Sequence, residues 1–461
     1  MWQLKGIPRS ALTKKRFTMK YHRLITGPIK FFILLALALP EKGSAIESTT
    51  PPGFTALWNG QNLDGWWGAG TEDPRKYLSM QPAEFQAKRD SSLADIQKHW
   101  RIENGELVND GQGLFLTSVK SYGDIELLLD YKTVALADSG IYLRGCPQVQ
   151  IWDSTEEAKF KLGADKGSGG LWNNSPGAPG KDPLVKMDKP FGEWNHFRIV
   201  MAGSRVWVWL NGEPTVVGAI LANYFDPKLP IPPRGPIQLQ THGGEIRWRN
   251  LFIREIGPDE ANQLLTGKED SNFKSIFNGK DFTGWAGPVD QYEVKDGAIV
   301  CKPEQGGTIY TQEEFTDFMV RLEFKLPPGG NNGLAIRYPG TGDPAYGGMC
   351  ECQVLDDDYE KVTGQKIDPR QAHGSAYGMV AAARGYQRPT GQWNYEEVTV
   401  RGSTVKVELN GTVILDADLS KVTEFAGGHA HPGKDLKSGH FGFAGHDDPV
   451  MYRNISIRPL D

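Results

Sequence analysis

The chain carries one domain-length series of motifs twice, and this repeat constrains the fold more than any other feature. A Phe-x-x-Leu/Ile-x-Asn-Gly segment closing on Gly-Trp occurs at 54–66 and returns at 273–285. A Leu-Asn-Gly turn and an Arg-Asn-Leu/Ile-x-Ile-Arg ending follow in the same order in both copies, at 210–212 and 249–254, then at 409–411 and 453–458. Because each copy spans about 200 residues, the repeat is a whole domain rather than one unit of a solenoid. The sequence predicts two homologous domains in tandem.

We place the first domain at 53–257, a linker at 258–271 and the second domain at 272–461. The formal net charge is −5 over 461 residues, which argues against a nucleic-acid surface and favours an uncharged or weakly charged ligand. The four cysteines are too few for a disulfide framework, so packed thiols are expected.

The N-terminus has the pattern of a signal peptide over residues 1–45. Basic residues precede the apolar run 31–39, and small residues follow at 43–45. The run is too short for a stable bilayer anchor, so no membrane span is expected after signal removal. We expect export to a periplasmic or extracellular location; an uncleaved amphipathic N-terminus is the alternative.

The local sequence pattern is all-β. Runs with period-two alternation, such as 125–131 and 205–210, recur between turn signals. Asn211-Gly212 and Asn410-Gly411 are typical of tight hairpins, whose central positions favour positive φ. Only 82–98 and 258–265 have a helical pattern. The prediction is two β-sandwiches joined by a short linker.

The motif series resembles the 3-keto-disaccharide hydrolase domain family. The opening segment, the Ser/Asn-Gly-Ile/Leu-x-x-Arg strand at 139–144 and 332–337, and the closing segment are present in both copies. The resemblance implies two tandem concanavalin/laminarinase-like jelly-roll β-sandwiches in a bacterial exported protein. It also implies that the partner is a carbohydrate or an oxidised glycoside.

In the second domain, the strand around Glu351 is the first candidate for a site. Alternation places Glu351 and Gln353 on one face and Cys352 and Val354 on the other. The neighbouring strand offers further polar groups for catalysis or substrate binding, Asn331 and Arg337. Asp356 lies an odd number of residues from Glu351, so it shares that face only if a bulge intervenes; a turn role is the alternative.

Histidines add further candidates. His373 lies in a glycine-rich loop, where it either reaches the substrate or is solvated. His446, a substrate-binding candidate, has a counterpart at His242 in the first copy. The pair His429 and His431 gives a weak signal for a transition metal.

The first domain has Gln148 where the second has Glu351, and a neutral amide cannot act as a general base. This domain is therefore interpreted as binding or structural. Its candidate substrate-binding residues combine amides, aromatic faces and charged groups. They are Arg144, Gln148, Gln150, Trp152, Asp153 and Trp172.

The family activity implies a substrate with a ketone at carbon 3, which acidifies the proton at carbon 2. Glu351 is then the expected base and Asp356 or His373 the acid, with Arg337 or a divalent cation stabilising the enolate. No cofactor follows with certainty. Two other functions stay open. One is a non-catalytic carbohydrate-binding surface protein. The other is a glycoside hydrolase of the laminarinase type, although that family carries an acid where this chain has Gln353.

Overall fold

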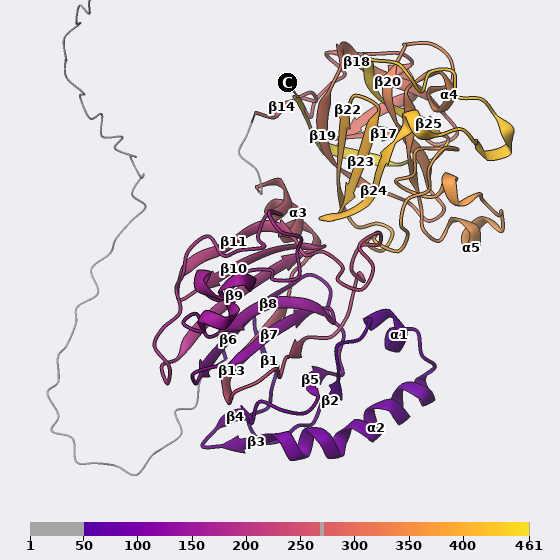
Figure 1. Cartoon of the computed structure of the whole chain (residues 1–461). Coiled ribbons are helices and arrows are strands. Elements are labelled where there is room, and N and C mark those ends of the chain that lie inside the picture. The colour runs from indigo at the N-terminus through magenta and orange to yellow at the C-terminus, as the bar shows by residue number, and fades with distance from the viewer. Residues whose placement is uncertain (1–49, 268–271, 461) are drawn as a thin grey trace, which may run out of the picture. The chain divides into compact units, whose positions relative to one another are not determined.

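A computed structural model describes residues 50–267 and 272–460. The predicted signal peptide at 1–45 and part of the predicted linker lie outside the described residues. Among the described residues, each repeat forms an eight-stranded and a five-stranded antiparallel sheet with a shared apolar core, so the all-β prediction is confirmed (Figure 1).

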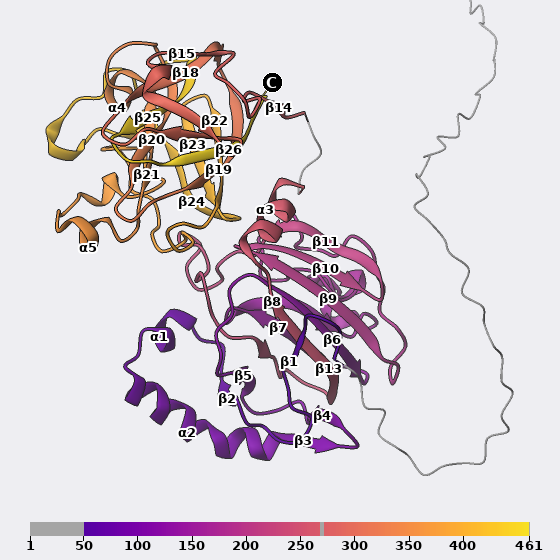
Figure 2. The ribbon, with the colours of Figure 1, turned by 180° about the vertical axis from the view of Figure 1, so that it is seen from behind.

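The first sandwich has the following strands. The larger sheet runs in the order β11 (Glu213–Ile220), β10 (Arg205–Leu210), β9 (Asn195–Ala202), β6 (Ile125–Thr133), β13 (Ile246–Glu255), β4 (Glu106–Asn109) and β3 (Trp100–Glu103), with β1 (Thr55–Ala56) beside β13. The smaller sheet runs β2 (Trp66–Ala69), β5 (Phe115–Ser118), β12 (Gln238–Leu239), β7 (Asp138–Leu143) and β8 (Cys146–Trp152). Strands β7 and β8 are also visible from behind (Figure 2).

The second sandwich repeats this order. Its larger sheet runs β16 (Tyr292–Lys295), β17 (Ala298–Cys301), β26 (Met451–Pro459), β19 (Phe318–Lys325), β22 (Asn394–Arg401), β23 (Thr404–Leu409) and β24 (Thr412–Asp418), with β14 (Lys274–Ser275) beside β26. The smaller sheet runs β15 (Trp285–Ala286), β18 (Gly306–Phe315), β25 (Gly439–His446), β20 (Asn331–Tyr338) and β21 (Cys350–Leu355).

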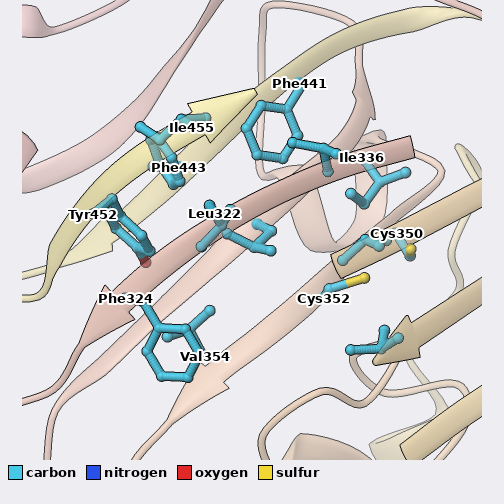
Figure 3. Close-up of a cluster of buried hydrophobic side chains, with 14 of the residues drawn as sticks. Leu322, Phe324, Ile336, Cys350, Cys352, Val354, Phe441, Phe443, Tyr452 and Ile455 are labelled. Atoms are coloured by element: carbon cyan, nitrogen blue, oxygen red, sulfur yellow. The ribbon is translucent and has the colours of Figure 1, made fainter. Parts of the chain in front are cut away.

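The core of the second sandwich lies between its two sheets. Figure 3 shows Cys350, Cys352 and Val354 of β21 facing the same interior as Leu322 and Phe324 of β19. These β21 side chains are fully buried, which confirms the predicted alternation and leaves the opposite face of β21 to Glu351 and Gln353.

Both predicted hairpins and both predicted helices are present. Asn211 and Asn410 have φ of 53° and 48°, as tight turns of this type require. The helices are α2 (Pro82–His99) and α3 (Pro258–Thr266). Three shorter helices were not predicted: α1 (Pro74–Leu78), α4 (Pro344–Gly347) and α5 (Tyr359–Thr363). Within the described ranges, no helix has the length and apolar character needed to cross a membrane.

Candidate functional site

The smaller sheet of the second sandwich forms the floor of a groove. One cavity of about 290 Å³ lies over β20, β21 and β25, and a second of about 330 Å³ lies over β18, β20 and β25. The two cavities share the lining residues Asp343, Glu351 and His446. Three ionisable groups therefore lie where the two halves of the groove meet.

Glu351 is the most perturbed acid of this groove. Its side chain is 3% exposed, and burial, followed by the nearby Asp343 charge, raises its pKa to about 8. The Gln353 amide lies on the same face. When its nitrogen faces Glu351 Oε1 at 3.0 Å and the Asn332 carbonyl oxygen at 2.9 Å, both acceptors are satisfied. The groove thus contains a carboxyl group whose ionisation is shifted into the neutral range, held by a neighbouring amide.

Loops supply the walls of the first cavity. Asp343 precedes α4 and accepts a hydrogen bond from the Ala345 N–H at 2.9 Å, which fixes the short helix that carries Tyr346. Opposite, the Tyr377 hydroxyl accepts from Gln371 Nε2 at 2.8 Å, and the Tyr346 and Tyr377 rings meet edge to face. Sequence patterns alone did not predict these residues. An Asp-Pro helix start between two strands was the available signal for Asp343 and Tyr346.

Arg337, predicted to face the substrate, points away from the groove. Its φ is 46° and the β20–β25 register shifts between Ala335 and Tyr338, so the backbone redirects the side chain. The guanidinium donates to the carbonyl oxygens of Thr316 at 2.7 Å, Gly402 at 2.7 Å and Leu436 at 2.9 Å. It also pairs with Asp317 Oδ1 at 2.8 Å. Arg337 therefore joins structural segments and is not part of the candidate site.

Asp356 and His373, the predicted acid partners, are likewise absent from the lining of both cavities. Asp356 follows the end of β21 and accepts from the backbone N–H groups of Gly329 at 2.7 Å and Asp358 at 3.1 Å. This is the turn role that the sequence left open.

His373 is buried against Phe324, with ring centroids 5.0 Å apart, and burial lowers its pKa to about 3. Its Nδ1 accepts from the Leu355 N–H at 3.4 Å, and its Nε2 faces Glu396 Oε2 at 3.5 Å. Burial raises the Glu396 pKa to about 8. His373 is 3% exposed and belongs to the interior of the sandwich.

The histidine pair proposed for a metal lies beside the groove. His431 Nδ1 contacts the Ala345 carbonyl oxygen at 2.8 Å, and both His429 and His431 pack near the Tyr346 ring. Over residues 50–267 and 272–460, no cluster of three His, Cys, Asp or Glu side chains has the geometry of a metal site.

The first sandwich has a cavity of about 240 Å³ over the equivalent sheet. Its lining includes four of the residues that the sequence proposes for substrate binding, and also His242. The four are Gln148, Gln150, Trp152 and Trp172. Two other predicted residues, Arg144 and Asp153, do not line it.

Arg144 has the same structural arrangement as Arg337, with φ of 55° and a salt bridge to Asp124 Oδ1 at 3.0 Å. Asp153 accepts hydrogen bonds from the N–H groups of Leu136 at 2.9 Å and Thr155 at 2.7 Å, so it fixes a turn.

Comparison with known proteins identifies the family. The model of the 3-keto-alpha-glucoside-1,2-lyase-like domain matches residues 53–254 and again 272–458. The chain belongs to this family. A similar curated relative is a 3-keto-disaccharide hydrolase of Bacteroides thetaiotaomicron, 26% identical over 255 residues that cover 46% of this chain and 86% of the relative.

Similar crystal structures come from Parabacteroides distasonis and are of proteins provisionally described as glycosyl hydrolases. One is 25% identical, covers 41% of this chain and 94% of its own, and superposes with a TM-score of 0.36. Another is 26% identical, covers 41% of this chain and 100% of its own, and has a TM-score of 0.37.

The two lyase-like domains differ at one decisive position. Gly140 pairs with Gln150 in β7–β8, and Gly333 pairs with Gln353 in β20–β21, so Gln148 occupies the place of Glu351. The second domain therefore has an ionisable group where the first has a neutral amide. Both halves of the chain thus belong to the 3-keto-alpha-glucoside-1,2-lyase-like domain family.

Proposed function

We propose that the second sandwich cleaves glycosides that bear a ketone at carbon 3, with Glu351 as the base that removes the proton at carbon 2. The observation that carries this proposal is a buried carboxyl at the centre of the groove whose pKa is raised to about 8. A carboxylate of raised pKa is a stronger base for a proton next to a ketone than an ordinary carboxylate, and burial raises the pKa here.

The reaction follows from the acidity that the ketone confers. The Glu351 carboxylate takes the proton from carbon 2, and the electron pair of that bond forms the enolate. The enolate then expels the glycosidic oxygen, so the carbon 1–oxygen bond breaks as a double bond forms between carbons 1 and 2. An acid protonates the leaving oxygen. Water next adds its hydroxyl to carbon 1 and a proton to carbon 2, which completes a net hydrolysis.

Other groove residues have roles in this scheme. Gln353 holds the Glu351 carboxylate through the 3.0 Å contact to Oε1. His446 lines both cavities with Glu351, and its imidazole is our candidate for the acid that protonates the leaving oxygen. The Asn331 amide, 3.2 Å from the Gln353 amide, is placed to contact the substrate oxygens.

The groove fits a substrate of two units. Because Glu351, Asp343 and His446 lie between the cavities, the bond to be cleaved would lie over them. The ketone-bearing sugar then occupies one cavity and the leaving group the other. The Tyr310 and Tyr338 rings line the second cavity and meet edge to face, with their centroids 5.4 Å apart. They offer an apolar surface to a leaving sugar or aglycone.

A divalent cation would stabilise the enolate oxygen if one binds. Glu351, Asp343 and His446 are oxygen and nitrogen donors that line the same groove, although they do not form a metal-site cluster among the described residues. Chelator treatment tests whether a cation takes part.

The test is product analysis of the full chain with a 3-keto-glucoside and with its unoxidised parent, each with and without chelator. We expect release of the leaving group from the ketone alone. Glu351→Gln should reduce that release by about 10²–10⁴-fold, whereas the matched control Asp356→Asn should retain it. Release from the unoxidised parent would favour an ordinary glycoside hydrolase, and no release from either would favour a carbohydrate-binding role.

A further inference from the structure

The first sandwich has a cavity whose chemistry the proposed cleavage does not use. It lies over the sheet position that carries the groove in the second sandwich, but its charged groups are arranged differently. Gly140 and Gly333 are equivalent positions of the two copies. Two residues before them along the strand, the first copy has Asp138 where the second has Asn331. The carboxyl group and the amide have therefore changed strands between the two copies.

Asp138 is held in an ionised state by its neighbours. Its Oδ2 lies 3.1 Å from Lys159 Nζ and 3.2 Å from His242 Nδ1, and its Oδ1 accepts from Gln150 Nε2 at 2.9 Å. Burial alone would raise the Asp138 pKa, but the hydrogen bonds from His242 and Lys159 lower it overall. A carboxylate with its lone pairs occupied in this way is a poor base for a carbon-bound proton. The cavity can bind a ligand but lacks the group that would cleave it.

The remaining lining residues suit a sugar. Trp172 is half-buried at the cavity, with Lys181 Nζ 4.7 Å from its ring centroid, and Tyr224 is 51% exposed beside it, so both residues contribute aromatic surface to the lining. Gln240 is 6% exposed, and its Oε1 accepts no hydrogen bond from any residue that the structure describes. Buried acceptors normally accept a hydrogen bond, and a ligand hydroxyl bound in this cavity could donate one to Gln240 Oε1.

We infer that this cavity is a second carbohydrate site, which binds one neutral pyranoside unit without cleaving it. The volume of about 240 Å³ lies below the usual range of ligand pockets, about 300–1,000 Å³, and fits a single ring rather than a disaccharide. The two basic residues of the lining, Lys159 and His242, both pair with Asp138, and Lys159 also pairs with Glu156, so their contacts are already taken up by acidic side chains rather than open to a uronate. This inference does not depend on the reaction proposed for the second sandwich.

The test is calorimetric titration of the full-length protein with methyl glycosides of glucose, galactose and mannose, none of which carries the ketone that the proposed cleavage requires. At least one of them should bind at the first sandwich. Trp172→Ala should weaken that binding by about tenfold or more, and Gln240→Leu should weaken it as well. Trp194→Ala changes a half-buried tryptophan that does not line the cavity; it is the matched control and should leave the binding unchanged.

Three results would overturn the inference. Binding that is insensitive to both Trp172→Ala and Gln240→Leu would place all sugar recognition elsewhere. Tighter binding of a methyl glucuronide than of the neutral glycosides would contradict the ligand class. No binding of any of these sugars would contradict the site itself, and ketone turnover by the wild-type protein would then show separately whether the proposed cleavage stands.

Discussion

Gly333 lies directly under the Glu351 side chain: a Cβ atom at position 333 would come within 2.2 Å of Glu351 Oε1. The adjacent strand therefore leaves room for the carboxyl group only because residue 333 has no side chain. The position of the proposed base depends on both strands, β20 as well as β21.

Gly333→Ala should displace Glu351 and lower kcat for the 3-keto-glucoside by about 10²-fold, because a shift of about 1 Å in a reacting group has effects of this size. The three atoms nearest to the added Cβ all belong to the Glu351 side chain, from Cγ outwards, so we expect this side chain to move while the fold persists. Steady-state kinetics with circular dichroism checks both points. Gly140→Ala, the equivalent change in the first sandwich, is the control and should leave kcat unchanged; an unaffected kcat in Gly333→Ala would separate Glu351 from the chemistry.

The pH dependence of turnover should report Glu351. Its pKa is raised to about 8, so the carboxylate form is a minority at pH 7, and kcat/KM should rise with pH through an apparent pKa near this value. Measuring kcat/KM from pH 5 to pH 9.5 gives the profile. A profile that rises instead near the ordinary pKa of a glutamic acid would indicate a solvated base and would contradict the assignment.

Arg337→Lys should reduce stability rather than activity. Lysine cannot reproduce the hydrogen bonds to Thr316, Gly402 and Leu436, so the free energy of unfolding should fall by about 2–5 kcal/mol. Urea denaturation measures this loss, and kcat/KM in the absence of urea should stay within about twofold of wild type. A large loss of kcat/KM with unchanged stability would show that Arg337 acts in catalysis or substrate binding.

The buried pair His373 and Glu396 should make stability depend on pH. The Glu396 pKa is raised to about 8, so its contribution is complete below the ordinary value near 4.5 and is lost as the pH rises towards 8. The His373 pKa is lowered to about 3, so its contribution is complete above about 6.5 and is lost as the pH falls towards 3.

Glu396→Gln removes the alkaline part of this dependence while keeping an acceptor for His373. The fall in Tm between pH 5 and pH 8 should become smaller in this variant, as measured by calorimetry. Exposed Glu424 provides the control, because Glu424→Gln should leave the slope as in wild type. Equal slopes in all three proteins would mean that Glu396 is ionised in the folded state.

Much of the fold could be predicted because local patterns specify it. The period-two alternation placed Cys352 and Val354 in the core and Glu351 and Gln353 on the opposite face, and the Asn-Gly turns fixed two hairpins. The repeat also related Gln148 to Glu351.

The errors concern residues whose direction depends on distant contacts. Arg337 turns away because its backbone leaves the extended conformation, which its sequence neighbourhood does not reveal. His373 meets Glu396, which comes from the facing sheet, so its burial follows from the packing of the two sheets. Tyr346 comes from α4 and Tyr377 from a loop, and the two meet only in the folded chain.

The most direct test of the proposed mechanism is the fate of the hydrogen at carbon 2. Cleavage of a 3-keto-glucoside in heavy water, stopped early and corrected for exchange without protein, should give a sugar product with solvent deuterium at carbon 2. Elimination followed by addition of water requires it, and Glu351→Gln should abolish both cleavage and incorporation. A product that keeps its original hydrogen at carbon 2 would contradict the proposed role of Glu351 and show that the glycosidic bond is cleaved by direct displacement.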